Sequence, residues 1–307
     1  MMSPSNGKML KQVARHWEYY LMLLPVLAYF AIFCYQPMYG VQIAFRDFRA
    51  SAGIMGSPFT GIKHFKRFFE SYYFSRLIIN TVSLSALAIL VSFPAPILLA
   101  LMMNEVRNNK FKRTVQTFTY APHFISTVVL VGMLQIFLHR SYGTVNIIRG
   151  FFGAEPIEFL ASAAWFRPVY VLSGVWQSAG WGSIIYMASL TSINPELIEA
   201  ARIDGAGRLR VIWHINLPGI LPTIIILLIL NVGSIMSIGF EKAFLMQYDR
   251  NLATSEIIST YVYKQGLLNA QFSFAAAVGL FNAVINLILL FTVNYVVSRL
   301  SPEHSLF

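Results

Sequence analysis

The sequence predicts an all-α, polytopic membrane protein with six transmembrane helices, and two features of its composition predict this. Apolar residues make up 56% of the 307 residues and charged residues only 12%, about half the charged share of a soluble protein. Six stretches also contain no Asp, Glu, Lys or Arg, and each exceeds the roughly 20 residues that cross the hydrocarbon core of a bilayer. These stretches are 19–45, 77–104, 114–138, 168–195, 211–240 and 265–298.

A backbone in lipid must satisfy its own hydrogen bonds, which leaves helices and closed barrels as the structures that can span a membrane. The apolar stretches are too long and too uniformly apolar for barrel strands. We therefore predict helices within a single domain that covers residues 1–307. The expected spans are about 18–39, 77–104, 116–138, 168–192, 217–240 and 272–298.

The first span follows a basic tail that contains Lys8, Lys11 and Arg15. Its apolar run is too long for a signal peptide, and no small-residue cleavage pattern follows it. We expect an uncleaved anchor with its N-terminus in the cytoplasm, because basic residues flank the cytoplasmic end of a first helix. An even number of spans then places both termini in the cytoplasm. The single cysteine, Cys34, excludes an internal disulfide and a cysteine-based metal site.

The connection after the first span ends in an amphipathic run, residues 62–76, in which aromatic side chains alternate with Lys and Arg. This pattern is typical of a helix that lies along the bilayer surface. A docking surface for a partner at the outer face is the alternative. The other charges lie in the connections between spans, and no compact basic patch collects them, which argues against a nucleic acid as the partner.

The connection between the fourth and fifth spans carries the most informative local pattern. Asn194 is a preferred N-cap residue, and Pro195 is favoured at the first position of a helix. Gly205 or Gly207 would be a typical C-terminal stop. We therefore expect a short helix at about 195–207, between two membrane helices. By itself this pattern also fits an ordinary surface helix.

The spacing in this connection resembles a known signature. The cytoplasmic loop of ABC importer permeases has the pattern Glu-Ala-Ala, three residues, Gly, nine residues, Ile, one residue and Leu-Pro, and the sequence matches it without a gap. In that family the short helix is a coupling helix, which sits in a cleft of an ATP-binding subunit and passes its movement to the membrane helices. The resemblance assigns this role to Glu199, Ala200, Ala201, Asp204, Gly205, Ile215, Leu217 and Pro218.

Further segments resemble the carbohydrate branch of this family, particularly the permeases for oligosaccharides or polysaccharide fragments. They are residues 58–62 with Phe65, Asn80-Thr81, 110–113 and 120–122, and the resemblance as a whole covers about residues 58–300. It implies a subunit in the cytoplasmic (inner) membrane of a bacterium, with the coupling loop in the cytoplasm. It also implies that the chain imports a sugar by alternating access.

The resemblance implies partners as well. The sequence contains no G-x-x-x-x-G-K-[ST] phosphate loop, so ATP and Mg²⁺ are expected in two separate ATP-binding cassette subunits. A second, related permease subunit and an extracytoplasmic solute-binding protein would complete the assembly. The chain itself is expected to hold no cofactor, no metal and no catalytic residue.

Polar residues inside the spans are the candidates for the substrate pathway, because they are costly against lipid. An aromatic platform beside amide groups suits a sugar ring, which has apolar faces and hydroxyl edges. The candidates are Trp176, Gln177, Ser178 and Trp181 in the fourth span, Asn231, Ser234 and Glu241 on one face of the fifth, and Asn282 and Asn286 on one face of the sixth. The alternative is that these side chains only bond one helix to another, while small residues such as Gly174 and Gly279 permit close packing.

Two other classes of function compete with this interpretation. An ion-coupled secondary transporter of a polar solute would need charged residues at mid-membrane or an internal repeat, and the sequence shows neither. A membrane enzyme would need a cluster of catalytic or metal-binding residues, whereas the six histidines are scattered over both sides of the predicted bilayer. We therefore expect a transport subunit and not an enzyme.

Overall fold

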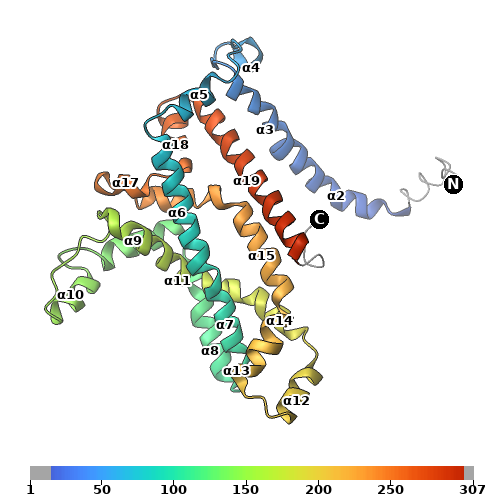
Figure 1. The fold of residues 1–307 in the computed structure, drawn as a ribbon. Coiled ribbons are helices and arrows are strands. Elements are labelled where there is room, and N and C mark those ends of the chain that lie inside the picture. Colours follow the sequence, from blue (N-terminus) through green and yellow to red (C-terminus); the bar gives the residue numbers. More distant parts are fainter. Residues whose placement is uncertain (1–14, 301–307) are drawn as a thin grey trace.

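The computed structural model describes residues 15–300, except for the side chain of the last of these, and they form an all-α structure (Figure 1). Within these residues there are two isolated β-bridges, one between Arg46 and Phe59 and one between Arg49 and Gly53. The basic residues Lys8 and Lys11, on which the predicted orientation depends, lie outside it. The short helices α4 (Gly53–Gly56) and α5 (Lys63–Phe69) mark one end of the molecule. The helix α12 (Pro195–Ile203) marks the opposite end.

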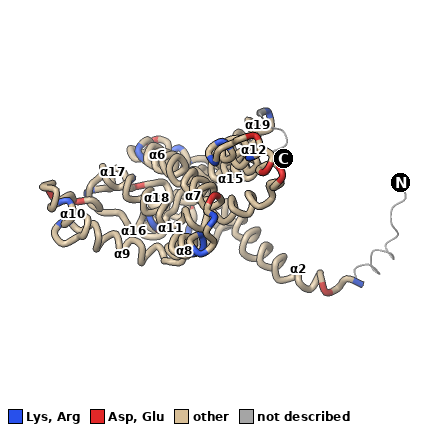
Figure 2. The backbone as a smooth tube through the Cα atoms, turned by 90° about the horizontal axis from the view of Figure 1, so that it is seen from below, with Lys and Arg blue, Asp and Glu red and all other residues tan. Residues whose placement is uncertain are grey.

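The first helix stands apart from the rest of the molecule. It consists of α2 (Trp17–Tyr29), a π-helical turn (Phe30–Tyr35), α3 (Gln36–Met38) and a 3₁₀ segment (Tyr39–Phe45). In two perpendicular views α2 points away from the other helices (Figures 1 and 2), and the most apolar window of this helix buries none of its residues. Only its final 3₁₀ segment packs beside α19 (Phe272–Leu300). The predicted span 18–39 lies within this helix.

The helix α5 covers the first half of the amphipathic run at 62–76. Its aromatic side packs against its own chain, because Phe68 is fully buried and its ring centroid lies 5.5 Å from that of Phe281 in α19. The last three residues of the run, from Phe74, already belong to the next long helix, and residues 70–73 connect the two. The surface-facing side of α5 carries the exposed residues Lys63, Lys66 and Arg67.

The second span is one continuous apolar helix of 31 residues, made of α6 (Phe74–Ser92) and α7 (Pro94–Asn104). It covers the predicted range 77–104. Phe93 between the two halves keeps helical backbone angles. Pro94 is tolerated because proline fits the first turn of a helical segment, where its missing N–H is least costly.

The third predicted span, 116–138, is not a single helix. α8 (Asn109–Tyr120) and a 3₁₀ turn (Ala121–Phe124) meet α9 (Thr127–Phe137) at an angle of 101°. Two residues explain this correction. Pro122 has no N–H to donate to the preceding turn, and the Ser126 hydroxyl accepts a hydrogen bond from the Val129 N–H at 3.3 Å, which starts a new helix. We call the break at residues 121–126 the elbow.

The fourth span is the central helix of the molecule. After α10 (Thr144–Phe151), α11 (Ala163–Thr191) runs for 29 residues and packs against α6, α7 and α8. Its contact with α8 is made backbone to backbone at Gly180, where an added Cβ would overlap the carbonyl oxygen of Thr119. A small residue is therefore required at this crossing.

The fifth predicted span, 217–240, is also corrected. The helix starts earlier, with α13 (Arg208–Val211), a π-helical turn (Ile212–Asn216) and α14 (Leu217–Gly219), and then bends by 60° into α15 (Leu221–Gly233). Pro222 lies in the first turn of α15, so the backbone bond that would bridge the bend is missing. α15 stops after Gly233 because the next free N–H, that of Met236, donates instead to Asn286 Oδ1 of α19 at 3.0 Å.

The residues between the fifth and sixth spans fold into short helices. They are α16 (Phe240–Leu245), a 3₁₀ turn (Asp249–Asn251), α17 (Leu252–Ser255), α18 (Ile258–Tyr263) and a π-helical turn (Lys264–Leu268). We call residues 240–271 the α16–α18 segment. It leads directly into α19, which contains the predicted sixth span 272–298.

Within the described residues, three helices are long and apolar enough to cross a membrane, or five if each bent pair counts as one span. The three are Trp17–Phe45, Phe74–Asn104 and Phe272–Arg299. α11 is long enough for the predicted fourth span, but it is not among these three helices. Ser, Gly and Trp take the place of aliphatic residues in it and make it less apolar. The all-α membrane architecture is therefore confirmed, while the count of six spans stays a prediction.

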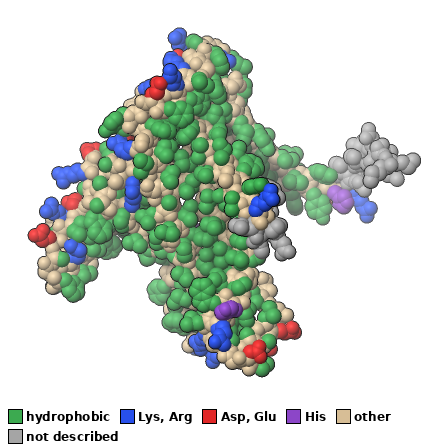
Figure 3. Space-filling model, viewed as in Figure 1, with side chains coloured by type: hydrophobic (Ala, Val, Ile, Leu, Met, Phe, Trp, Pro, Cys, Tyr) green, Lys and Arg blue, Asp and Glu red, His purple; other side chains and the backbone are tan. Residues whose placement is uncertain are grey.

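Three clusters of buried apolar side chains hold the helices together. The first joins α6, α9, α11 and α16, the second joins α5, α6, α18 and α19, and the third joins α7 and α11 to the bend between α14 and α15. On the face shown in Figure 3, apolar side chains cover the middle of the molecule, and charged side chains gather at its extremities. The third cluster fixes the helices from which α12 projects.

Candidate functional site

The helix α12 starts as the sequence predicts. The Asn194 side-chain oxygen accepts a hydrogen bond from the Glu196 N–H at 3.0 Å, and Pro195 occupies the first turn. Glu196 also lies in this turn, where a carboxylate is stabilised by the positive end of the helix dipole. Only residues 192–194 separate α12 from the end of α11. The short helix is therefore attached directly to the central helix of the molecule.

The end of α12 is fixed by Gly205. The Ala206 N–H donates to the Ala201 carbonyl at 2.8 Å, and the Gly205 N–H donates to the Arg202 carbonyl at 3.1 Å. These two bonds form a Schellman motif, which requires a left-handed residue after the helix. Gly205 supplies it, with φ of +78°. The helix thus ends four residues before the expected limit at 207.

The coupling-loop residues divide into an exposed group and a packed group. Glu199, Ala200, Asp204, Gly205 and Pro218 are exposed, whereas Ala201, Ile215 and Leu217 are partly buried. Leu217 packs against the cluster that joins α7 and α11. On α12 itself, Leu197 is 56% exposed and Ile203 87% exposed. The role of this helix in coupling stays a prediction.

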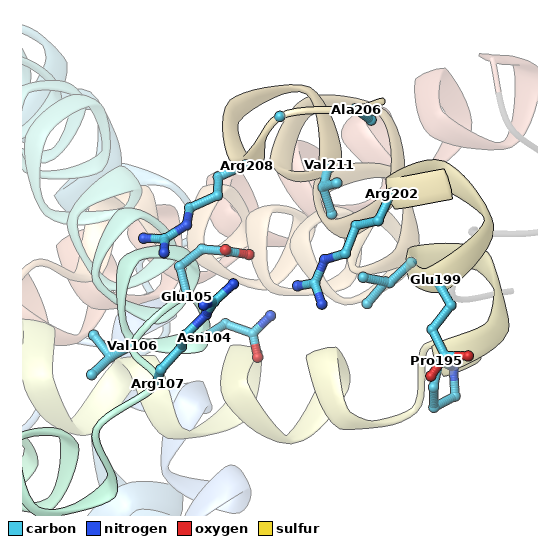
Figure 4. Close-up of a pocket in the computed structure, with 12 residues that line it drawn as sticks. Asn104, Glu105, Val106, Arg107, Pro195, Glu199, Arg202, Ala206, Arg208 and Val211 are labelled. Carbon is cyan, nitrogen blue, oxygen red and sulfur yellow. The ribbon is translucent and has the colours of Figure 1, made fainter. Parts of the chain in front are cut away.

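A pocket of about 580 Å³ lies between α12 and the end of α7 (Figure 4). It is lined by Asn104, Glu105, Val106, Arg107, Pro195, Ile198, Glu199, Arg202, Ala206, Gly207, Arg208 and Val211. Glu105 accepts a long hydrogen bond of 3.5 Å from the side chain of Asn216, which is fully buried. Sequence reasoning missed Glu105 and Arg107, because they belong to a different connection and no motif links them to residues 195–211.

Loss of the N-cap should weaken α12 measurably. Replacing Asn194 with alanine removes the acceptor for the Glu196 N–H, which should lower the local stability of the helix by about 1 kcal/mol. Amide hydrogen exchange of residues 195–203 in the purified chain should then be about fivefold faster. Asn108 caps α8 in the same way, so Asn108→Ala is the matched control and should leave exchange in α12 unchanged. Equal exchange in the wild type and Asn194→Ala would contradict this role.

One of the two tryptophan candidates of the fourth span, Trp181, belongs to a small aromatic cluster. Trp181 stacks on His123 with a centroid separation of 4.6 Å and an interplanar angle of 3°, and the Phe124 ring meets it edge-on at 5.6 Å. Both partners come from the elbow. Trp181 is 44% exposed and Trp176 is 48% exposed, so each presents part of its ring for contact with another molecule.

Gln177 has a structural partner. Its side-chain nitrogen donates to the Ile125 carbonyl at 2.8 Å. This carbonyl belongs to the elbow, where the helical bonds are interrupted. Gln177 therefore satisfies backbone that would otherwise be exposed to an apolar surrounding, and it ties α11 to the elbow.

The candidates of the fifth span do not share a helix face. Asn231 and Ser234 lie at the end of α15, but Glu241 lies in α16, beyond the break. Asn231 donates to the Leu227 carbonyl at 2.7 Å. It also lines a groove of about 340 Å³ together with Ser178 of α11 and residues of α6 and α7. Of the predicted pathway residues, Asn231 and Ser178 line this groove.

In the sixth span, Asn286 bonds to the turn after α15. Its side-chain oxygen accepts from the Met236 N–H at 3.0 Å, and its nitrogen donates to the Ser237 hydroxyl at 2.7 Å. Asn282, one turn earlier, has a buried side-chain oxygen without a hydrogen-bond partner among the described residues. The pathway role of these asparagines stays a prediction, and a role in joining helices is already visible for Asn286.

Sequence reasoning missed a buried ion cluster in the α16–α18 segment. Glu256 is 7% exposed, and its two carboxylate oxygens accept from Arg76 at 2.7 Å and from Lys264 at 3.2 Å. The two basic side chains are partly exposed, and together they compensate the charge of this buried carboxylate. These three residues are separated by up to 188 positions in the sequence (264 minus 76), so no local pattern connects them.

The Asn80-Thr81 pair of α6 holds the same segment. The Asn80 side chain donates to the carbonyls of Ala253 and Glu256 at 2.9 and 3.0 Å. The Thr81 hydroxyl accepts from the Ile258 N–H at 3.0 Å. The pair therefore caps backbone groups of the loops between short helices, and it fixes the α16–α18 segment to α6.

At the end of the molecule that carries α5, an acidic residue is held by two basic neighbours. Asp47 lies 2.7 Å from Lys63 and 2.9 Å from His64. The hydrogen bond from Lys63 holds the pKa of Asp47 below its usual value. No group of three or more His, Cys, Asp or Glu suited to a metal ion occurs within residues 15–300.

Comparison with known proteins places the chain in a family. Residues 92–302 match the family model described as "Binding-protein-dependent transport system inner membrane component". The chain is 46% identical over 284 residues to the polygalacturonan/rhamnogalacturonan transport system permease protein YteP of Bacillus subtilis (strain 168), with 92% of this chain and 88% of the relative covered.

Solved structures agree with this match. One belongs to a bacterial ABC transporter involved in the import of the acidic polysaccharide alginate, with a TM-score of 0.89 and 42% identity over 96% of this chain and 99% of that chain. A second shows the alginate transporter in complex with an alginate pentasaccharide-bound periplasmic protein, with a TM-score of 0.88 and 42% identity over the same shares of both chains.

These matches decide between the classes of function that the sequence left in competition. The matched region contains α12 and the helices that hold it, and the similarity of the whole fold extends over 96% of the chain. The matches therefore favour a transport permease over an ion-coupled secondary transporter and over a membrane enzyme. The chain is a membrane-embedded transport permease, and it belongs to the family of binding-protein-dependent transport system inner membrane components.

Proposed function

We propose that this chain is one of two related permease subunits in an ATP-driven importer that carries fragments of an acidic polysaccharide into the cell. The observation that carries the proposal is the geometry of α12. It is a capped helix with exposed apolar side chains, it follows the central helix after three residues, 192–194, and it carries the Glu-Ala-Ala motif. The sequence has no phosphate loop, so the ATP and Mg²⁺ belong to two partner subunits that bind α12.

Two arguments support an acidic sugar. The relative named above is a permease of a polygalacturonan/rhamnogalacturonan transport system, and the similar structures belong to a transporter involved in the import of the acidic polysaccharide alginate. In this chain, the end opposite α12 is basic. A surface hollow of about 810 Å³ there is lined by Lys63, Lys66, Arg67, Glu70, Ser71, Tyr73, Tyr261, Gln265 and Phe274. Basic side chains around such a hollow attract a polyanion and raise its local concentration.

The proposed cycle assigns a side of the membrane to each end of the molecule. α12 and both chain termini face the cytoplasm, and the end that carries α5 faces the solute-binding protein outside. When the ATP-binding subunits close on ATP, they draw the α12 helices of the two permeases together. The α16–α18 segment then opens toward the binding protein, and the sugar enters between the two permeases, past Trp176, Trp181 and Asn231.

Co-purification tests the assembly. The tagged full-length chain is solubilised from membranes of its native host in mild detergent, and its partners are identified by mass. We expect one kind of ATP-binding subunit, a second permease and a solute-binding protein. Recovery of the chain alone, as a stable homo-oligomer without a nucleotide-binding partner, would contradict the proposal.

A transport assay tests the substrate. The purified assembly is reconstituted in liposomes with its binding protein, and ATP-dependent uptake is measured for an oligogalacturonate and for a neutral malto-oligosaccharide of equal length. We expect uptake of the acidic sugar only. Uptake of the neutral sugar alone would refute the acidic substrate and leave the ATP-driven importer intact.

A further inference from the structure

The pocket between α12 and the end of α7 has an unbalanced charge. Three arginines and two glutamates line it: Arg107, Arg202, Arg208, Glu105 and Glu199. None of the five ion pairs within residues 15–300 involves any of them. None of the three guanidinium groups has a hydrogen-bond partner in that part of the chain either. Each guanidinium carries five N–H donors, and the three guanidinium groups against two carboxylates leave the pocket with a net charge of +1.

The three arginines come from separate parts of the fold. Arg107 follows α7, Arg202 lies in the last turn of α12, and Arg208 begins α13. In the close-up, Arg202 and Arg208 extend from the α12–α13 side toward the segment that carries Glu105 and Arg107 (Figure 4). The carboxylates of Glu105 and Glu199 offset only part of the charge of these three arginines, so a further anion would be stabilised in the pocket. Planar guanidinium groups favour phosphate and carboxylate, which they bind through two parallel hydrogen bonds.

The surface beside the pocket indicates where the anion comes from. α13 exposes Leu209 (74%), and the π-helical turn after it exposes Trp213 (64%). Arg208 precedes Leu209, and Arg210 lies between Leu209 and Trp213. Exposed tryptophan and leucine next to arginine are typical of the membrane–water boundary. Basic pockets between helices at that depth, on the cytoplasmic side, are suited to anionic lipid headgroups. The volume of about 580 Å³ is large enough for a glycerophosphate group.

We propose that this pocket binds a phosphate-bearing anion, supplied by the headgroup of an anionic phospholipid in the cytoplasmic leaflet. The phosphate would bridge α12 to the segment after α7, because Arg202 belongs to the first and Arg107 to the second. The position of the coupling helix would then depend on the lipid as well as on the ATP-binding subunits. This inference goes beyond the proposed function and relies on it only for the side of the membrane.

A binding measurement on the purified full-length chain tests the site without any transport assay. The chain is incorporated into nanodiscs of phosphatidylcholine, and its affinity for fluorescent phosphatidylglycerol is titrated. Arg202→Gln and Arg208→Gln should each weaken binding about fivefold, since a basic residue near the surface contributes about 1 kcal/mol to the binding of an anionic lipid. Arg210→Gln is the matched control, because Arg210 lies on the same helix as Arg208 but does not line the pocket.

The outcomes separate a site from general surface charge. A loss in Arg202→Gln and Arg208→Gln with no loss in Arg210→Gln supports the pocket. An equal loss in all three variants would overturn it, as would binding that is unchanged in all of them. Titration with inorganic phosphate distinguishes the sources: competition at concentrations close to those of the lipid assigns the site to a free phosphate, and its absence assigns the site to the headgroup. The three arginines are exposed, and size-exclusion profiles check that each variant is folded.

Discussion

Replacing Gly180 with alanine is expected to disrupt the packing of α8 on α11. The added Cβ would overlap the carbonyl oxygen of Thr119 and approach the Thr119 Cβ to 2.9 Å. The first of these atoms is backbone and cannot rotate away, so the two helices must separate. Overpacking of this kind costs about 1–3 kcal/mol or more. The variant should show a clearly lower melting temperature in detergent and a smaller yield of monodisperse protein.

Gly279→Ala provides the matched control, because it makes the same chemical change in another long helix. No atom of the described chain lies within 4 Å of a Cβ built at Gly279. Alanine is favoured over glycine within a helix by about 1 kcal/mol, so this variant should be as stable as the wild type or slightly more stable. Equal melting temperatures for Gly180→Ala and Gly279→Ala would show that the crossing of α8 and α11 is not as close as described.

Replacing Gly205 with valine is expected to abolish ATP-dependent uptake while membrane insertion continues. No atom lies within 4 Å of a Cβ at this position, so the cause is not a clash but the φ of +78°. A β-branched residue in the left-handed region costs about 1–2 kcal/mol, which changes the population of correctly ended helix roughly tenfold. α12 would then extend past its normal end and present its exposed side chains in the wrong direction.

Two variants distinguish backbone strain from a general effect on this loop. Gly207 has φ of −71° and equally open surroundings, so Gly207→Val should retain most of the uptake. Gly205→Asn should be intermediate, because asparagine tolerates the left-handed conformation better than other residues. Undiminished uptake by Gly205→Val would remove the support for a role of the Schellman motif in coupling.

The sequence predicts those parts of the fold that depend on local composition. The uniform apolar runs around Phe74–Asn104 and Phe272–Arg299 became long helices. The start of α12 was predictable for the same reason: Asn194 and Pro195 act on the backbone next to them. The sequence also predicted that a glycine would end α12, because glycine readily takes the left-handed conformation after a helix. It did not decide between Gly205 and Gly207.

The breaks in the third and fifth spans were not predictable from composition. A proline does not mark a break by itself, because many prolines in membrane helices leave the helix intact, as Pro94 does here. The elbow is stable because Gln177 on a distant helix bonds to its backbone. The stop after α15 depends in the same way on Asn286. Such partners become visible only once the helices have been packed together.

The same limit applies to the candidate sites. The sequence suggested that Gly174 and Gly279 permit close packing of helices. A Cβ at Gly279 would meet no other part of the described chain, whereas the close helix crossing occurs at Gly180. The face shared by Asn231 and Glu241 was inferred from an unbroken helix, and it disappears with the break after Gly233.

The direct connection of α12 to α11 makes the central helix a lever. Its other end also has a firm attachment, because the Thr254 hydroxyl of α17 donates to the carbonyl of Ala163, the first residue of α11, at 2.9 Å. A helix of 29 residues is about 43 Å long, so a tilt of about 5° about one end moves the other by about 4 Å. Under the proposed function, a tilt of α11 that accompanies a movement of α12 would reach the α16–α18 segment through one rigid element, without a relay of intermediate contacts.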